Sequence, residues 1–157
     1  MKAIVVTDQA AGTAGMTLVE RPEPQAAIND VVVQVHASGF VPTELAWPST
    51  WTDRLDRDRT PSIPGHELAG VVTALGYGTR GLSVGQRVFG LTDWHRDGTL
   101  AEYVAVEARN LAPLAEVIGP PAEHAVQLVY ELCGLLPGTR ADSQRASSRA
   151  ATLTPSP

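Results

Sequence analysis

Cysteine, clustered basic residues and long apolar runs are all scarce in this sequence of 157 residues. Cys133 is the one cysteine, so an intramolecular disulfide is excluded. Asp and Glu number 17 against 12 Lys and Arg, and the resulting net charge of −5 argues against a nucleic-acid partner. No run approaches the roughly 20 apolar residues of a membrane span, and the opening MKAIVVTDQA is too short and too polar for a signal peptide. We therefore expect a cytoplasmic location with no membrane partner.

The hydrophobic content of 43% is typical of one globular domain. Short apolar segments separated by Gly and Pro predict strands at Lys2–Val6, Met16–Glu20, Val31–Ala37, Glu67–Leu75, Gln86–Leu91 and Leu100–Ala108. Many short strands with frequent turns predict a mainly β fold of barrel or sandwich type. The segment Thr50–Ser62 alternates Asp and Arg, and we interpret it as a solvated loop.

The character of the sequence changes after Pro113. An amphipathic pattern predicts one helix over Pro120–Gly138, with Pro121 in its first turn. The remainder, Thr139–Pro157, is rich in Ser, Thr, Ala and Arg and is predicted to be a disordered tail. The predicted organisation is a β domain over residues 1–115, a helical segment over 116–138 and a tail over 139–157.

The stretch GYGTRG matches the G-x-G-x-x-G spacing of a dinucleotide-binding turn at Gly76, Gly78 and Gly81. That turn requires a strand before it and a helix that opens at the third glycine, so that the helix N-terminus faces the pyrophosphate. The strand is predicted, but Leu-Ser-Val-Gly follows Gly81 and opposes a helix. We therefore predict that these glycines form tight turns between two strands and hold no phosphate.

A longer stretch, IPGHELAGVVTALGYGTRGLSVGQRVFG, resembles the N-terminal catalytic (GroES-like) domain of the medium-chain dehydrogenase/reductase family. The family pattern P-G-H-E-x-x-G-x-V is matched at Pro64–Val72, and V-G-D-R-V is matched at Val84–Val88 except for Gln86. VVVQVHASGFVPTEL before this stretch and GTLAEYVAVEARNLAPL after it also resemble the family. The resemblance covers residues 1–114 and implies a partial β-barrel with short helices.

Zinc-dependent members of the family read G-x-C-x-T-D before P-G-H-E. His66 matches their histidine ligand and Glu67 its acidic neighbour, but Val41 stands at the cysteine position and cannot bind a metal. A catalytic zinc needs about three protein ligands. The four cysteines of the family's structural zinc lobe are also missing. We therefore expect no zinc.

The zinc-free quinone oxidoreductase-like subgroup often reads G-x-N-P-x-D/E, which Gly39, Pro42 and Glu44 match and Val41 does not. This resemblance implies hydride transfer from NADPH to a quinone or an α,β-unsaturated carbonyl. The hydride chemistry belongs to the cofactor, and the protein positions it.

Three residues are candidates for the active site, each with a structural alternative. Thr43 matches a family position whose hydroxyl relays a proton, and its structural alternative is a short-helix cap. His66 is either a proton donor or a hydrogen-bonded structural residue, and Glu67 is either catalytic or an anchor for His66 or an arginine. The tryptophans Trp47, Trp51 and Trp94 either line an apolar pocket or simply pack.

Family members continue into a dinucleotide-binding domain, and no such domain follows Leu114 in this sequence. We therefore expect that the chain alone does not hold NADP. The function predicted is the catalytic-domain portion of a zinc-independent NAD(P)H-dependent oxidoreductase. The alternatives are a non-enzymatic GroES-like binding module, which uses an exposed sheet edge for a partner or a second copy, and a non-functional truncation product.

Overall fold

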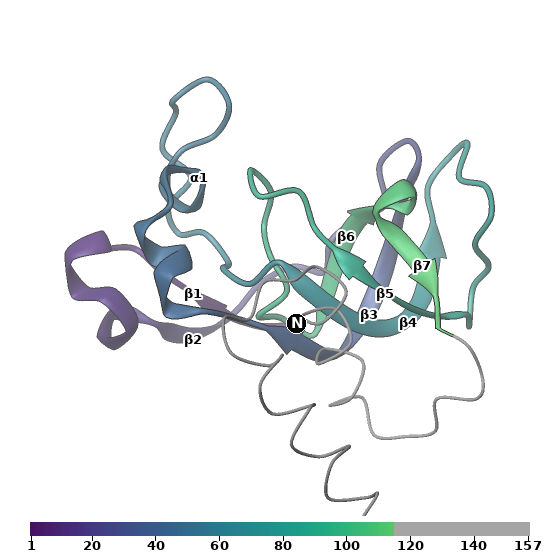
Figure 1. Cartoon of the computed structure of the whole chain (residues 1–157), viewed down its shortest axis with the longest axis horizontal. Helices are drawn as coiled ribbons and strands as arrows, with labels where there is room; N and C mark the ends of the chain where they lie inside the picture. The colour runs from purple at the N-terminus through teal and green to yellow at the C-terminus, as the bar shows by residue number, and fades with distance from the viewer. Residues whose placement is uncertain (115–157) are drawn as a thin grey trace, which may run out of the picture.

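The computed structural model describes residues 1–114, and Figure 1 shows that they form a strongly curved sheet beside a two-stranded ribbon. The ribbon pairs β1 (Lys2–Val5) with β2 (Thr17–Glu20). The curved sheet contains β3 (Asp30–Gly39), β4 (Glu67–Leu75), β5 (Arg87–Leu91), β6 (Tyr103–Glu107) and β7 (Leu111–Pro113). Every pair of neighbouring strands is antiparallel, in the order β6-β3-β4-β5-β7.

The prediction of a mainly β, partial barrel is confirmed, and each of the six predicted strands is present to within a few residues. Two register shifts between β3 and β4, at Val32/Val33 and Val35/Ala37, account for much of the curvature, because bulges bend a strand and increase its twist. Within residues 1–114 the sheet does not close, since β6 and β7 are its two edges.

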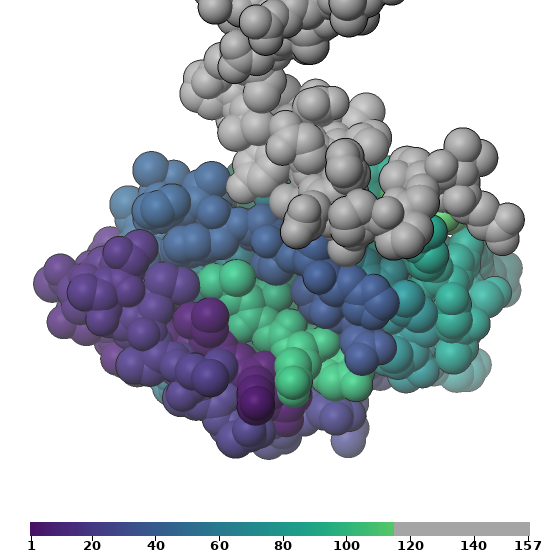
Figure 2. Space-filling view, turned by 90° about the horizontal axis from the view of Figure 1, so that it is seen from below, coloured from purple at the N-terminus to yellow at the C-terminus, as the bar shows by residue number. Residues whose placement is uncertain are grey.

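The ribbon and the curved sheet are joined through the chain just before β6. The backbone N–H of Glu102 donates to Lys2 at 3.0 Å, and the Glu102 carbonyl accepts from Val35 in β3 at 2.9 Å. Figure 2 shows the result as a green band of late residues between the purple N-terminal residues and the blue ones that follow β3. The two sheets therefore form one continuous body.

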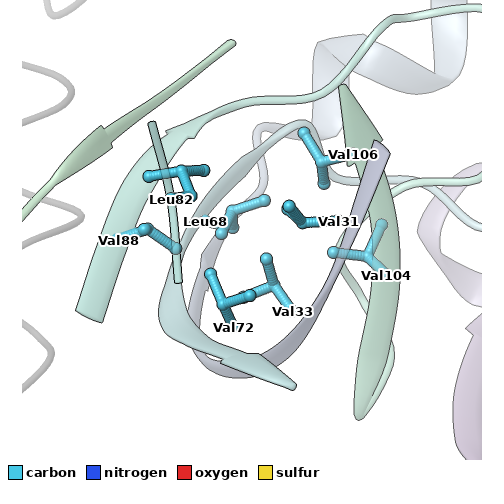
Figure 3. Packing of buried hydrophobic residues seen from close by; sticks show 8 residues of the cluster. All are labelled: Val31, Val33, Leu68, Val72, Leu82, Val88, Val104 and Val106. Atoms are coloured by element: carbon cyan, nitrogen blue, oxygen red, sulfur yellow. The ribbon is translucent and has the colours of Figure 1, made fainter. Parts of the chain in front are cut away.

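The core lies inside the curve of the sheet, where Figure 3 shows its side chains pointing toward one another. It consists of the alternate, inward-facing residues of four strands and one turn residue: Val31, Val33, Leu68, Val72, Leu82, Val88, Val104 and Val106. Burying a valine or leucine side chain contributes about 1.5–3 kcal/mol. The buried side chains that stabilise the fold are thus the apolar residues of the alternating pattern in the strands.

The predicted turn role of the glycines is confirmed. β4 ends at Leu75 and β5 begins at Arg87, with no helix between them. Gly78, Gly81 and Gly85 all have φ between +81° and +84°, the left-handed region that L side chains avoid.

Short helices occupy the segments between strands. Two 3-10 helices, Gln9–Gly15 and Pro42–Ala46, precede β2 and α1 (Pro48–Trp51), and a third at Ala108–Asn110 joins β6 to β7. None of the helices among the described residues has the length and apolar character that a membrane crossing requires. The predicted helix over 120–138 and the predicted tail over 139–157 lie outside the described residues.

Candidate active site

His66 lies directly before β4, in the only stretch of nine consecutive buried residues, Ser62–Gly70, that the described chain contains. It is joined to Thr92, the residue after β5, at two points. The Thr92 backbone N–H donates to the His66 carbonyl at 2.7 Å, and the Thr92 hydroxyl lies 3.1 Å from ring atom Nδ1. These contacts extend the β4–β5 pairing by one residue beyond Glu67 and Leu91, so the sheet itself sets the position of the imidazole.

Two tryptophans form an aromatic wall beside the imidazole. Trp47, at the junction of the 3-10 helix and α1, stacks on His66 with ring centroids 5.9 Å apart and planes 15° apart. Trp94, in the loop after β5, stacks on Trp47 at 4.9 Å and is tilted toward His66 at 6.3 Å. Trp94 is half exposed, so the stack runs from the buried imidazole to the surface. Trp51 has a different role, since its indole N–H donates to the Leu45 carbonyl at 2.8 Å.

A buried carboxylate on the 3-10 helix Pro42–Ala46 faces the other ring nitrogen. Glu44 Oε2 lies 3.7 Å from His66 Nε2. Its two oxygens accept from two backbone N–H groups, Oε1 from Val41 and Oε2 from Gly65, each at 3.0 Å. His66 Nε2 itself is buried and has no hydrogen-bond partner within the described part of the chain.

The surroundings of the site oppose charge on both groups. Burial, and after it the nearby charge of Arg59, lower the pKa of His66 to about 4, while Asp93 acts in the opposite direction. Burial also raises the pKa of Glu44, although its backbone N–H donors from Val41 and Gly65 act against this, and repulsion from Glu67 adds to the rise. The imidazole is therefore neutral at physiological pH, which leaves one ring nitrogen as a donor and the other as an acceptor.

The three residues predicted from sequence take different places. His66 and Glu67 are both buried and adjacent at the start of β4. Glu67 packs against Gly39 so closely that a Cβ there would lie 1.8 Å from Oε2, which explains a glycine at the end of β3. Thr43 is exposed on the 3-10 helix that carries Glu44.

The interpretation of Thr50–Ser62 as a solvated loop is wrong at its two ends and at Arg59. Thr50 and Ser62 are buried, and the Ser62 hydroxyl donates to the Thr50 carbonyl at 2.6 Å. The Arg59 side chain is only 11% exposed, because its guanidinium donates to the carbonyls of Ser49 and Trp94. Alternating charge indicated exposure, but backbone carbonyls from two other segments satisfy this arginine.

Sequence reasoning also assigned no role to Glu44 and Thr92. Glu44 was visible as the acidic residue of the G-x-x-P-x-E match, which is the one signal that pointed to it. No sequence signal marked Thr92, whose importance comes from the strand pairing that places it beside His66.

The described residues contain no group of three or more His, Cys, Asp or Glu side chains arranged to hold a metal ion. They also contain no strand–turn–helix unit of the dinucleotide-binding kind. What the site contains is a neutral, positioned imidazole beside a carboxyl group and two stacked tryptophans.

Residues 27–116 match the family described as the alcohol dehydrogenase GroES-like domain. The chain belongs to this family. With it comes membership of the medium-chain dehydrogenase/reductase superfamily, as the resemblance implied.

Individual relatives of this GroES-like chain agree with the family. An L-threonine 3-dehydrogenase from Saccharopolyspora erythraea is 40% identical over 91 residues, covering 57% of this chain and 25% of the relative. A solved alcohol dehydrogenase superfamily protein from Novosphingobium aromaticivorans is 32% identical with a TM-score of 0.64, covering 80% of this chain and 37% of that one. A quinone oxidoreductase from Pseudomonas syringae is 25% identical with a TM-score of 0.66, covering 80% and 36%.

The GroES-like chain spans between a quarter and a half of the curated relatives it matches most strongly. These relatives are dehydrogenases by name.

Proposed function

We propose that this chain supplies the catalytic-domain portion of a zinc-independent NAD(P)H-dependent oxidoreductase that reduces quinones or α,β-unsaturated carbonyls. The observation that carries the proposal is the neutral, buried His66 held between Thr92, Glu44 and the Trp47–Trp94 wall. Membership of the GroES-like family supports the reaction class, and the composition of the site supports the zinc-free subtype.

The residues at the site do not fit a catalytic zinc. Val41 occupies the place of the family's cysteine ligand and offers no donor atom. Glu44 is the nearest other candidate, but both of its oxygens already accept backbone N–H groups. A catalytic zinc takes about three protein ligands. Among these residues only His66 could supply one. We therefore assign no step of the reaction to a metal.

The cofactor, NADP by family resemblance, supplies a hydride when bound, and we propose that a separate dinucleotide-binding domain holds it. No described residue is assigned to the nucleotide, because the Gly76–Gly81 turns open no helix. The residues of this chain bind and orient the substrate. The Trp47–Trp94 wall binds the flat face of the substrate and excludes water, and His66 hydrogen-bonds to the carbonyl oxygen on which negative charge develops.

Tryptophan fluorescence tests this site without the cofactor. We expect saturable quenching by duroquinone, whose fully substituted ring does not alkylate the protein, after correction for absorbance. His66→Gln and Trp94→Phe should each weaken binding, the former by about five- to tenfold for one lost hydrogen bond. Trp51→Phe is the matched control, since the Trp51 indole N–H donates to the Leu45 carbonyl and the ring contacts of the wall involve only Trp47, Trp94 and His66. Absence of saturation, or equal affinity in His66→Gln, would contradict the proposal.

Metal content and NADPH titration test the other two parts of the proposal. We expect the chain, purified after growth with added zinc, to retain far less than one zinc ion per molecule. We also expect no NADPH binding in the micromolar range. Stoichiometric zinc would contradict the zinc-free subtype, and micromolar NADPH binding would contradict the separate cofactor domain.

A second candidate function is a non-enzymatic GroES-like binding module, and the open sheet with edges at β6 and β7 favours it. The fluorescence experiment separates the two functions. A chain that binds no quinone but forms a stoichiometric complex with a defined protein through β7 is a module.

A further inference from the structure

We propose that Arg59 is a positioning residue that holds together the two halves of the Trp47–Trp94 wall. Its guanidinium hydrogen-bonds to the backbone of both segments that carry these tryptophans, and it thereby fixes how the two indoles stack. The contribution of this stack to substrate binding rests on the proposed function, whereas the positioning itself does not.

The two tryptophans come from segments that lie far apart in the sequence. Trp47 directly precedes α1, whereas Trp94 lies in the loop after β5. Their ring centroids are 4.9 Å apart and their planes are 29° apart. Trp94 is half exposed, so its ring is packed on one side only. A stack of this kind needs a further contact that keeps the loop beside α1.

Arg59 supplies that contact through a single nitrogen. Its Nη1 donates to the Ser49 carbonyl in α1 and, at 3.3 Å, to the carbonyl of Trp94 itself. A guanidinium nitrogen only donates and a carbonyl oxygen only accepts, so the direction of both hydrogen bonds is fixed. The backbone N–H of Arg59 also donates to the Trp51 carbonyl at 2.9 Å, which attaches Arg59 to α1 at a second point.

The surroundings of the guanidinium make these hydrogen bonds costly to break. The Arg59 side chain is largely buried, and so is Ser49. Asp97, three residues after Trp94, lies 3.8 Å from Nη2 and provides a counter-charge from the same loop. Hydrogen bonds from a charged donor are stronger than those between neutral groups. If Trp94 moves away from α1, a buried cation loses an acceptor, and this opposes the motion.

Circular dichroism of the full chain reads the stack directly. Two indoles in this arrangement couple their electronic transitions and produce an exciton couplet in the far ultraviolet. The signal of this pair is the part of the wild-type spectrum that disappears in Trp94→Phe. We expect Arg59→Gln, which has neither the charge nor the reach of arginine, to lose most of the couplet. Arg59→Lys keeps the charge without the guanidinium fork, and we expect it to lose part of the couplet.

Arg57→Gln is the matched control. Arg57 lies in the same loop as Arg59, its side chain is exposed, and its guanidinium binds Asp53 at 2.6 Å. The substitution removes the same charge from the same segment and should leave the couplet unchanged. Thermal unfolding of each variant shows whether the fold is retained. A role of Arg59 in the fold alone would leave the couplet of a folded Arg59→Gln unchanged.

An unchanged couplet in folded Arg59→Gln would overturn the proposal, as would a wild-type spectrum identical to that of Trp94→Phe. If Arg59→Gln does not fold, Arg59→Lys decides by the same signal. Unfolding of both variants would also overturn it, because Arg59 would then be required by the whole domain. Where duroquinone binds, Arg59→Gln should weaken binding as much as Trp94→Phe does. Failure of duroquinone to bind the wild type would refute the proposed function and leave the couplet as an independent readout.

Discussion

At the scale of the residue, the behaviour of His66 is decided by desolvation. A histidine near the surface titrates close to pH 6.5, whereas burial and Arg59 hold the pKa of His66 at about 4. A neutral imidazole in this position is a hydrogen-bonding group and not a cation.

The depressed pKa of His66 makes stability depend on pH. Between pH 6.5 and about 4 the unfolded chain binds a proton that the folded chain does not, so the free energy of unfolding falls as the pH is lowered through this window. His66 contributes at most about 3 kcal/mol to this change in the free energy of unfolding. Urea unfolding at pH 7 and pH 4.5 should show a smaller difference in His66→Gln than in the wild type.

Glu44 acts in the opposite sense, because its raised pKa makes the folded chain bind a proton first and so favours folding as the pH falls. The comparison between wild type and His66→Gln separates the two groups. An equal pH dependence in both would contradict the assignment to His66.

The turn glycines give a second prediction at this scale. Gly81 has φ +81°, and a Cβ there would meet nothing within 4 Å, so Gly81→Ala should cost only the strain of a left-handed residue, about 1–2 kcal/mol. At Gly76 a Cβ would lie 1.7 Å from the Ala27 carbonyl oxygen, so Gly76→Ala should cost more. Thermal unfolding measures both, and a smaller loss at Gly76 than at Gly81 would contradict the account of the turn.

At the scale of the element, β4 carries residues of both the core and the candidate site. Its first half, from Glu67 to Gly70, is entirely buried beside the site, and its last three residues, Thr73 to Leu75, are exposed. The sequence ELAGVVTAL predicted this strand with the correct bounds, since its β-branched and small residues suit a central strand.

Substitutions along β4 test that division. Leu68 is completely buried in the core, whereas Leu75 is 41% exposed. Leu68→Ala should lower the free energy of unfolding by about 2–5 kcal/mol, and Leu75→Ala in the same strand should lower it by less than about 1 kcal/mol. Equal losses in urea titrations would show that the packing of Leu68 does not determine the stability of the sheet.

At the scale of the whole molecule, an ion pair joins segments that lie far apart in sequence. Asp30, at the start of β3 and 2% exposed, accepts from both Nη atoms of Arg96 at 3.1 and 2.6 Å. Arg96 lies in the same loop as Trp94, two residues further on. The pair thus ties the loop that carries part of the aromatic wall to the curved sheet.

Breaking this pair should affect both stability and the site. Asp30→Asn leaves the half-buried Arg96 without its counter-charge, and we expect a loss of about 1–3 kcal/mol together with weaker duroquinone binding. Arg109→Gln is the control, since it removes the exposed partner of Glu107, a pair worth less than about 1 kcal/mol, and leaves the charges that act on Arg96 in place. Unchanged stability in Asp30→Asn would show that the loop is held by its backbone contacts alone.

The sequence by itself determined the strands and the turns, because hydrophobic alternation and glycine placement are local properties of the chain, and its motif resemblance indicated the family. His66 and Glu67 were also within its reach, through the P-G-H-E match. Only the tertiary structure decided which groups surround His66, since Glu44, Arg59, Thr92 and Trp94 come from separate segments that the curved sheet brings together. Charge and hydropathy describe each segment alone, whereas a pKa or a tautomer depends on neighbours supplied by folding.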